Sequence, residues 1–410
     1  MTQSSVTSDF FPSFSAAEYE RRHERLRRAM GERGLDCLVV YGFHHYNGND
    51  VGQTNVVWLA GFANVVQSYV VFPVEPPATL VVGLPFHLPV AKKLARLDRV
   101  VADPGLVGGA IAALQALPQT PIRIGLVGYY QGLTLPYEHR QALAAALPDT
   151  RWEDVTGWFH DLRLVMSSEE ADLLRRAGAL SDRVHDRIFE ATRPGVTHAE
   201  VCRLIGLEAL GAGGHWALSH VGSTPMTSPD AYYPDFYATC EPFRVGDLCQ
   251  TEIAVGYGNY LVKTTCSYFI GTPTPEYRRL FHVAAEIQNR CIEGLMPGMT
   301  GADADVFTEP AVREGLRLSQ PVVGGFGMYN TAPWAGAVAD TALAAMCRPF
   351  RDFVFEPGHS LFVIGTPHLP GTRQGLWVGQ TCLMTESGLE PLGAYAVDRL
   401  RVVNVAEHDD

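Results

Sequence analysis

The first 162 residues combine two patterns of apolar positions, one with the period of a helix and one typical of short strands. Residues 16–30 predict a helix whose apolar side is formed by Tyr19, Leu26, Ala29 and Met30. Short apolar runs predict strands at 35–41, 56–59, 69–72, 80–82 and 122–127, and longer mixed runs predict helices at 90–97 and 138–146. Helices between strands indicate an α/β layer with a mixed or parallel sheet.

From residue 163 the pattern changes to long helices separated by Pro-Gly breaks. The segment Ser167–Glu170 has the spacing of a capping box and precedes apolar residues at helical spacing. That helix stops at Arg193-Pro194-Gly195, and Thr197–Glu200 is a second capping box. A long helix, a Pro-Gly pair and a capped helix recur around Met296-Pro297-Gly298. The recurrence predicts an internally duplicated domain, with chance repetition of one such unit as the alternative.

The composition and charge of the chain exclude several classes of protein. An apolar content of 47% with 19% charged residues is that of a globular chain. The formal charge of −12 argues against nucleic acid and anionic membrane as partners. No apolar run approaches the roughly 20 residues of a membrane helix, and no secretory signal is visible at the start. Eight cysteines without C-x-x-C spacing indicate reduced, mostly buried thiols, so we expect a cytoplasmic protein.

Six segments in this order resemble the creatinase, prolidase and aminopeptidase P family. They are Ser167–Glu170, the paired Pro-Gly-Val/Met-Thr units, Val245–Glu252, Tyr268–Gly271, Gly324–Gly327 and Gly379–Gly388. The resemblance implies a creatinase-type α/β N-terminal domain over residues 1–162. It implies an α+β pita-bread catalytic domain with internal duplication over residues 163–410, and assembly as a homodimer.

The resemblance also implies five positions at which the family binds two divalent metal ions. Here they are occupied by Glu252, Lys263, Phe326, Thr366 and Gly379. Two adjacent hard cations need several oxygen or imidazole ligands, and a lysine adds repulsion where negative charge is required. We therefore expect no metal and no other cofactor. Creatinase, a metal-free member, uses a histidine after a proline, and the matching residue here is Asp235.

Four residues are candidates for acid–base or nucleophilic catalysis, namely Asp235, Glu252, Lys263 and His368. Glu252 and Lys263 are expected on neighbouring strands across the Gly256-Tyr257-Gly258 turn, where they could equally form a buried salt bridge that replaces the charge of the metal. Asp235 could be an ordinary turn residue. His368 could serve a purely structural role, although its side chain titrates near neutral pH.

Further polar and aromatic residues are expected to bind substrate because they fall in segments that line the cleft of relatives. They are His215, His220, Tyr233, Asn330, Trp334, Thr366 and Gln380. In dimeric relatives, loops of the N-terminal domain reach the partner's active site, so His44, His45 and Asn55 are added as candidates. A solvated surface loop is the alternative for the segment around His44 and His45.

These residues lead to one main hypothesis and two alternatives. The main hypothesis is a metal-independent enzyme that hydrolyses or eliminates at a C–N or similar bond of a small nitrogen-containing organic molecule, in a setting such as specialised metabolism. One alternative is a catalytically inactive pita-bread protein that binds a ligand or peptide. The other is a metallo-aminopeptidase or Xaa-Pro dipeptidase. A small-molecule substrate is the expected partner.

Overall fold

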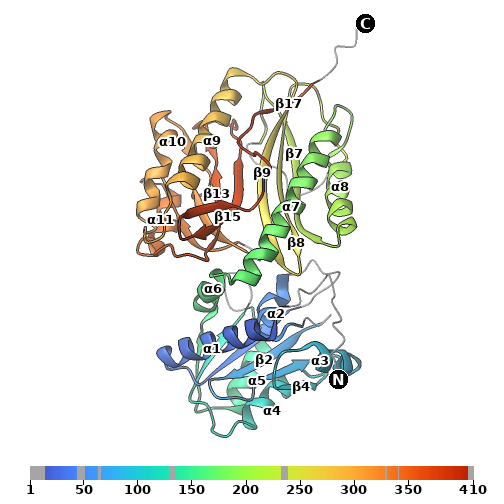
Figure 1. Ribbon diagram of the computed structural model, residues 1–410, viewed down its shortest axis with the longest axis vertical. Coiled ribbons are helices and arrows are strands. Elements are labelled where there is room, and N and C mark those ends of the chain that lie inside the picture. Colours follow the sequence, from blue (N-terminus) through green and yellow to red (C-terminus); the bar gives the residue numbers. More distant parts are fainter. Residues whose placement is uncertain are drawn as a thin grey trace. The chain divides into compact units, whose positions relative to one another are not determined.

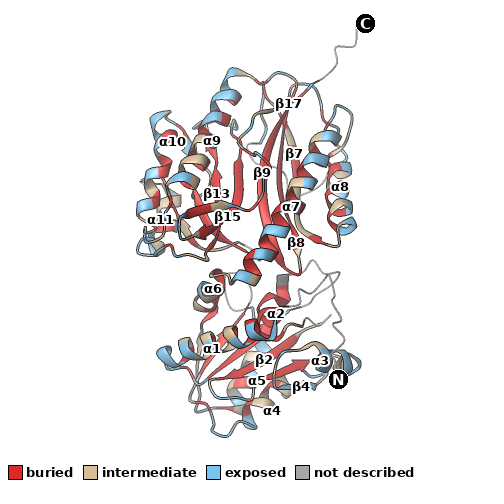
Figure 2. Ribbon diagram, in the orientation of Figure 1, coloured by how far each residue is buried: buried red, intermediate tan, exposed pale blue. Residues whose placement is uncertain are grey.

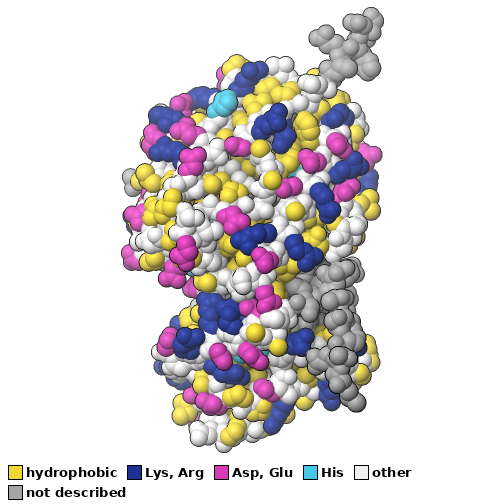
Figure 3. Space-filling view, viewed as in Figure 1, with side chains coloured by type: hydrophobic (Ala, Val, Ile, Leu, Met, Phe, Trp, Pro, Cys, Tyr) yellow, Lys and Arg dark blue, Asp and Glu magenta, His cyan; other side chains and the backbone are white. Residues whose placement is uncertain are grey.

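The computed structural model describes residues 14–43, 51–62, 66–128, 134–231, 239–327, 330–339 and 341–404, except the side chains of Val51 and Asn330. Its contacts divide the chain into two compact units, residues 1–163 and 164–410, which are considered separately below. Among the described residues, no helix combines the length and apolar character needed to span a membrane. Basic and acidic side chains are interspersed over the face seen in Figure 3, so no single-sign patch dominates that face.

The first unit is built on a mixed six-stranded sheet with the strand order β4-β3-β2-β1-β5-β6. Its strands are β1 (Cys37–Gly42), β2 (Ser68–Pro73), β3 (Thr79–Val82), β4 (Arg99–Ala102), β5 (Arg123–Val127) and β6 (Arg151–Asp154). Its helices are α1 (Ala16–Arg33), η1 (Val51–Gln53), α2 (Thr54–Ala60), η2 (Pro85–His87), α3 (Leu88–Leu94), α4 (Val107–Gln115), α5 (Tyr137–Ala146) and α6 (Thr156–Leu164). The expected α/β layer is confirmed, with β1 antiparallel to β2 and parallel to β5.

One predicted strand of this unit is wrong. Residues 56–59 lie in helix α2, all seven residues of which are buried. A short, fully apolar run has the same composition in a buried helix as in a buried strand, so its periodicity could not separate the two. Strands β4 and β6 were not predicted from the sequence. The residues of β6, Arg151–Asp154, form no apolar run, and those of β4 are exposed or only partly buried.

The second unit contains a large sheet with the strand order β12-β11-β13-β15-β9-β8-β7. Its strands are β7 (His215–Pro225), β8 (Asp247–Tyr257), β9 (Tyr260–Ile270), β11 (Val323–Phe326), β12 (Asn330–Ala335), β13 (Ser360–Gly365) and β15 (Val378–Thr385), with β16 (Gly388–Pro391) beside β15 and β17 (Arg401–Val403) beside β9. A separate pair is formed by β10 (Arg317–Leu318) and β14 (Pro367–His368). The helices are α7 (Ser168–Ala191), α8 (His198–Gly211), α9 (Pro275–Gly294), η3 (Asp303–Thr308), α10 (Glu309–Arg313), α11 (Ala342–Cys347) and η4 (Arg348–Phe350).

The two halves of this unit repeat one arrangement. Helix α7 packs on β8 and β9, and α9 packs on β13 and β15 (Figure 1). Both predicted capping boxes are present, at Ser167–Glu170 and Thr197–Glu200. After α9, Thr300 and Asp303 exchange the same pair of bonds, with distances of 2.7 Å and 3.3 Å. The expected internal duplication is therefore confirmed.

Burial follows the same division into a sheet and covering helices. The central strands β8 and β9 of the large sheet are almost wholly buried, whereas the helices expose their outer sides (Figure 2). One face of the sheet forms the main core with the helices, through residues such as Val184, Ile205, Ile253 and Ile287. The opposite face carries the polar side chains considered next.

Candidate active site

The hairpin β8–β9 determines which side chains share the face of the sheet that points away from α7. Its turn consists of Gly258 and Asn259, both with positive φ, and Tyr257 pairs with Tyr260. The turn therefore overlaps the expected Gly256–Gly258 turn only at Gly258. Glu252 pairs with Thr265 and Lys263 pairs with Ala254, so alternation places Glu252 and Lys263 on the same face.

Glu252 lies between a histidine and a lysine. His220 on β7 pairs directly with Glu252, and its Nδ1 lies 3.4 Å from Glu252 Oε2. The Lys263 Nζ lies 3.3 Å from Glu252 Oε1. The exposed fractions of the side chains are 14% for His220, 5% for Glu252 and 2% for Lys263. The three residues form a row that runs from the partly accessible histidine to the buried lysine.

The surroundings of Lys263 are apolar. Its Nζ lies 3.7 Å from the ring centroid of Phe362 and 5.3 Å from that of Phe326. Aromatic faces attract an ammonium group, so these rings and Glu252 together compensate part of its lost hydration. Burial lowers the pKa of Lys263, while the charge of Glu252 and the hydrogen bond to it act in the opposite direction.

This row has the geometry of an oriented base. A neutral His220 whose Nδ1–H donates to Glu252 carries its lone pair on Nε2, which can accept a proton from water or substrate. Lys263 places a positive charge on the far side of Glu252. The sequence had assigned His220 to substrate binding, and only the register between β7 and β8 reveals its contact with Glu252.

The five metal-ligand positions of the family do not fit a pair of divalent cations here. Lys263 places an amino group beside Glu252, and Phe326 places a hydrocarbon ring beside Lys263. Gly379 has no side chain, and a Cβ built there would lie 2.7 Å from the Ile364 side chain. Among the described residues, no group of three or more His, Cys, Asp or Glu side chains could hold a metal ion. A single carboxylate cannot supply the several hard ligands that two such cations require.

Two sequence candidates are engaged away from this row. The Thr366 hydroxyl accepts hydrogen bonds from the backbone N–H groups of Ser319 and Gln320, at 3.1 Å each, which gives it a structural role. Gln380 pairs with Thr264, whose hydroxyl contacts Ser181 of α7, so Gln380 belongs to the opposite face of the sheet. The strand pattern alone had not distinguished Gln380 from its neighbour Gly379, which lies on the face of Glu252.

The remaining histidines and Trp334 occupy separate places. His215 begins β7 and pairs with Gly256, on the same face as Glu252 but farther along the strand. His368 lies in the small β10–β14 pair, where burial lowers its pKa. Trp334 covers Gly324 on the face of Glu252. Asp235, Tyr233, His44 and His45 lie outside the described residues, as does the side chain of Asn330.

Asn55 has a structural environment within the first unit. It is buried, its side chain donates to the Gly128 carbonyl at 2.7 Å, and its Oδ1 accepts a hydrogen bond from Arg163. Its Nδ2 also lies 3.4 Å from His160 Nε2. These contacts hold the Asn55 amide in place within the first unit.

Comparisons with known proteins agree with this architecture. The model of metallopeptidase family M24 matches residues 172–386, which is more than half of the chain, and the creatinase/prolidase N-terminal domain matches residues 22–165. The chain belongs to metallopeptidase family M24. Within this M24 chain, the N-terminal domain is of the creatinase type, and the C-terminal domain has the pita-bread fold.

The relatives of this M24 protein include several hydrolases. Ectoine hydrolase of Halomonas elongata is 24% identical over 93% of this chain and 96% of its own length. Probable dipeptidase PepE of Mycobacterium tuberculosis is 30% identical over 55% of this chain and 58% of its own length. The structure of PepE from Mycobacterium ulcerans has a TM-score of 0.76 and 23% identity, covering 96% of this chain and 100% of that one. At this identity the structural likeness establishes the fold.

Proposed function

We propose that this M24 protein is a metal-independent hydrolase that cleaves a C–N bond of a small nitrogen-containing organic molecule. The observation that carries the proposal is the row His220–Glu252–Lys263, in which the carboxylate of Glu252 lies between an imidazole and an amino group. The whole-length similarity to ectoine hydrolase supports a small-molecule substrate. The matches to dipeptidases make dipeptides the main competing class.

In the proposed reaction, each residue of the row has a distinct role. His220 Nε2 removes a proton from water as the water oxygen attacks the carbon of the C–N bond. Glu252 accepts the Nδ1–H bond and stabilises the resulting imidazolium. Lys263 holds Glu252 in its ionised form. The imidazolium then returns the proton to the leaving nitrogen, which breaks the C–N bond and restores His220.

The test is turnover by metal-stripped protein. Ectoine, creatine and an Xaa-Pro dipeptide are incubated separately with the chelator-treated protein, and the products are identified by mass spectrometry. We expect hydrolysis of at least one small molecule without added metal. We expect His220→Asn to reduce it about 100-fold or more, because asparagine keeps the contact with Glu252 but cannot take a proton.

Arg348→Gln serves as a control, because Arg348 is exposed in η4 and outside the row. Turnover that appears only after addition of Mn²⁺, Co²⁺ or Zn²⁺ would instead identify a metallopeptidase. The lack of any turnover, with or without metal, would favour the inactive binding protein. Homodimerisation and a cytoplasmic location belong to the proposal as family expectations, and light scattering of the purified chain tests the dimer.

A further inference from the structure

A polar cavity of about 380 Å³ lies at the end of β7, the edge strand of the large sheet. Its volume falls in the lower part of the range of small-molecule sites. Its polar lining includes His198, Ser223, Asp230, Glu241, Gln250 and Arg373. None of these residues was predicted from the sequence to belong to a site.

Gln250 contributes a fixed amide to this cavity. It is only 3% exposed, and its Oε1 accepts a hydrogen bond from the Trp377 backbone N–H at 3.1 Å. Because the Trp377 N–H requires an acceptor, this bond sets the orientation of the amide. The Nε2 group therefore carries two donors, for which the described residues provide no partner. Gln250 lines the cavity, so these donors can bond an acceptor of a ligand held there.

Arg373 adds a positive charge to the same lining. Its Nη1 donates to the Asp230 backbone carbonyl at 2.7 Å, which anchors the guanidinium at the cavity. Among the described residues, no carboxylate forms an ion pair with Arg373. A guanidinium presents several N–H donors in a plane, which suits the two oxygens of a carboxylate.

The remaining wall is rich in hydrogen-bond acceptors. Both ring nitrogens of His198 are engaged, by the Thr239 hydroxyl and the Ser223 hydroxyl at 2.9 Å each. Asp230 and Glu241 also line the cavity, and Asp230 Oδ1 accepts a hydrogen bond from the Thr224 hydroxyl at 2.7 Å. This part of the cavity thus offers partners to an N–H group of the same ligand.

The geometry points to a binding site for a small molecule that carries both a carboxylate and an N–H group. The carboxylate is held by Arg373 and the Gln250 amide, and the N–H group faces the Asp230 and Glu241 oxygens. Gln250 and Glu252 alternate onto the same face of β8 and are about 7 Å apart along the strand. The site thereby defines the substrate class of the proposed hydrolase. Only the statement that the ligand is a substrate rests on that proposed function; the binding of the ligand does not.

The experiment measures binding and not turnover. Saturation-transfer NMR is recorded with N-acetylglycine and with N-acetylglycinamide, which has the same skeleton but no carboxylate. We expect the wild-type protein to bind N-acetylglycine at least about 10-fold more tightly than the amide. Arg373→Gln and Gln250→Glu should each remove this preference. The second change keeps the acceptor for Trp377 and replaces the amide donors with a repelling carboxylate.

A control variant lies outside both the cavity and the catalytic row. Arg348→Gln removes an exposed arginine and should leave binding unchanged. Because the readout is binding and not turnover, its outcome does not depend on whether the proposed hydrolysis is correct. Equal binding of acid and amide, no binding of N-acetylglycine, or binding unaffected by Arg373→Gln and Gln250→Glu would each overturn the assignment.

Discussion

At the scale of single residues, the contact between Lys263 and Glu252 makes a clear prediction about stability. Lys263→Met leaves the Glu252 carboxylate buried without its cation, and breaking such a pair costs about 3–5 kcal/mol. Urea denaturation measures this loss. In the double variant Glu252→Gln/Lys263→Met no buried charge of the pair remains, so we expect much of the stability to return. If the double variant were as unstable as Lys263→Met, the pair would not be the cause.

The same lysine predicts a pH dependence of the proposed activity. Burial lowers the pKa of Lys263 below its ordinary value of 10.5. As the pH rises through this lowered pKa, the ammonium loses its proton and Glu252 loses its positive neighbour. Activity should therefore fall on the alkaline side, and in Lys263→Arg the fall should move to higher pH because arginine stays protonated. A pH–rate profile that is identical in both proteins would contradict this role.

The sequence predicted part of this site. The adjacency of Glu252 and Lys263 followed from two polar positions on consecutive strands of a hairpin. The place of His220 did not follow, because His220 is 32 residues from Glu252 and only strand register brings the two together. The face on which Gln380 lies did not follow either, because a shift of one position along a strand changes the face of the sheet.

At the scale of elements, the Trp334 side chain of β12 packs directly over a glycine of β11. A Cβ at Gly324 would lie 2.7 Å from the Trp334 ring, which covers this position. We expect Gly324→Ala to destabilise the protein by about 1–3 kcal/mol and to alter tryptophan fluorescence. Gly211→Ala is the matched control, since nothing lies within 4 Å of a Cβ at Gly211. Equal stability of both variants would show that Trp334 moves aside at little cost.

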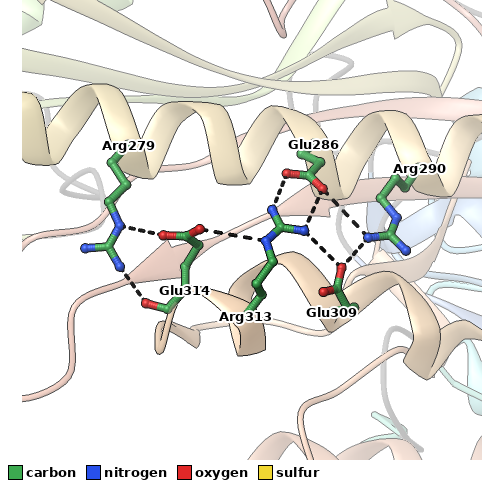
Figure 4. Close-up of polar contacts among 6 residues, drawn as sticks. All are labelled: Arg279, Glu286, Arg290, Glu309, Arg313 and Glu314. Carbon is green, nitrogen blue, oxygen red and sulfur yellow. Dashed lines mark hydrogen bonds and ion pairs between the residues drawn. The ribbon is translucent and has the colours of Figure 1, made fainter.

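Helices α9 and α10 are joined by a network of exposed ion pairs (Figure 4). Its centre is Arg313, which lies 2.8 Å from Glu286 and 3.2 Å from Glu309. Exposed pairs contribute little and are screened by salt. We expect Arg313→Gln to lower the melting temperature slightly in dilute buffer, and this difference should vanish at high salt. Arg348→Gln, which removes an arginine outside the network, should show no such salt dependence.

The sequence correctly predicted those elements whose secondary structure depends on local residues and not on packing against other elements. The capping boxes at Ser167–Glu170 and Thr197–Glu200 are local, and both form. The segment 56–59 was misread because its secondary structure depends on packing against β1 and β2. The small β10–β14 pair contains only two residues in each strand, too few for a pattern to indicate it.

At the scale of the whole molecule, the sheet packs closely around positions that the family resemblance assigns to metal ligands. We therefore predict that replacing two of these residues does not restore metal binding. Lys263→Asp/Phe326→His would return two family ligands, but the other positions hold Thr366, bound to the backbone, and Gly379. Gly379→Glu would place its Cβ 2.7 Å from Ile364 and 2.8 Å from the Val363 carbonyl, so we expect it to be strongly destabilising. Metal analysis of Lys263→Asp/Phe326→His after dialysis against Mn²⁺ should therefore find less than two ions per chain. Two firmly held ions in that variant, or in the wild type, would show that the family site is retained.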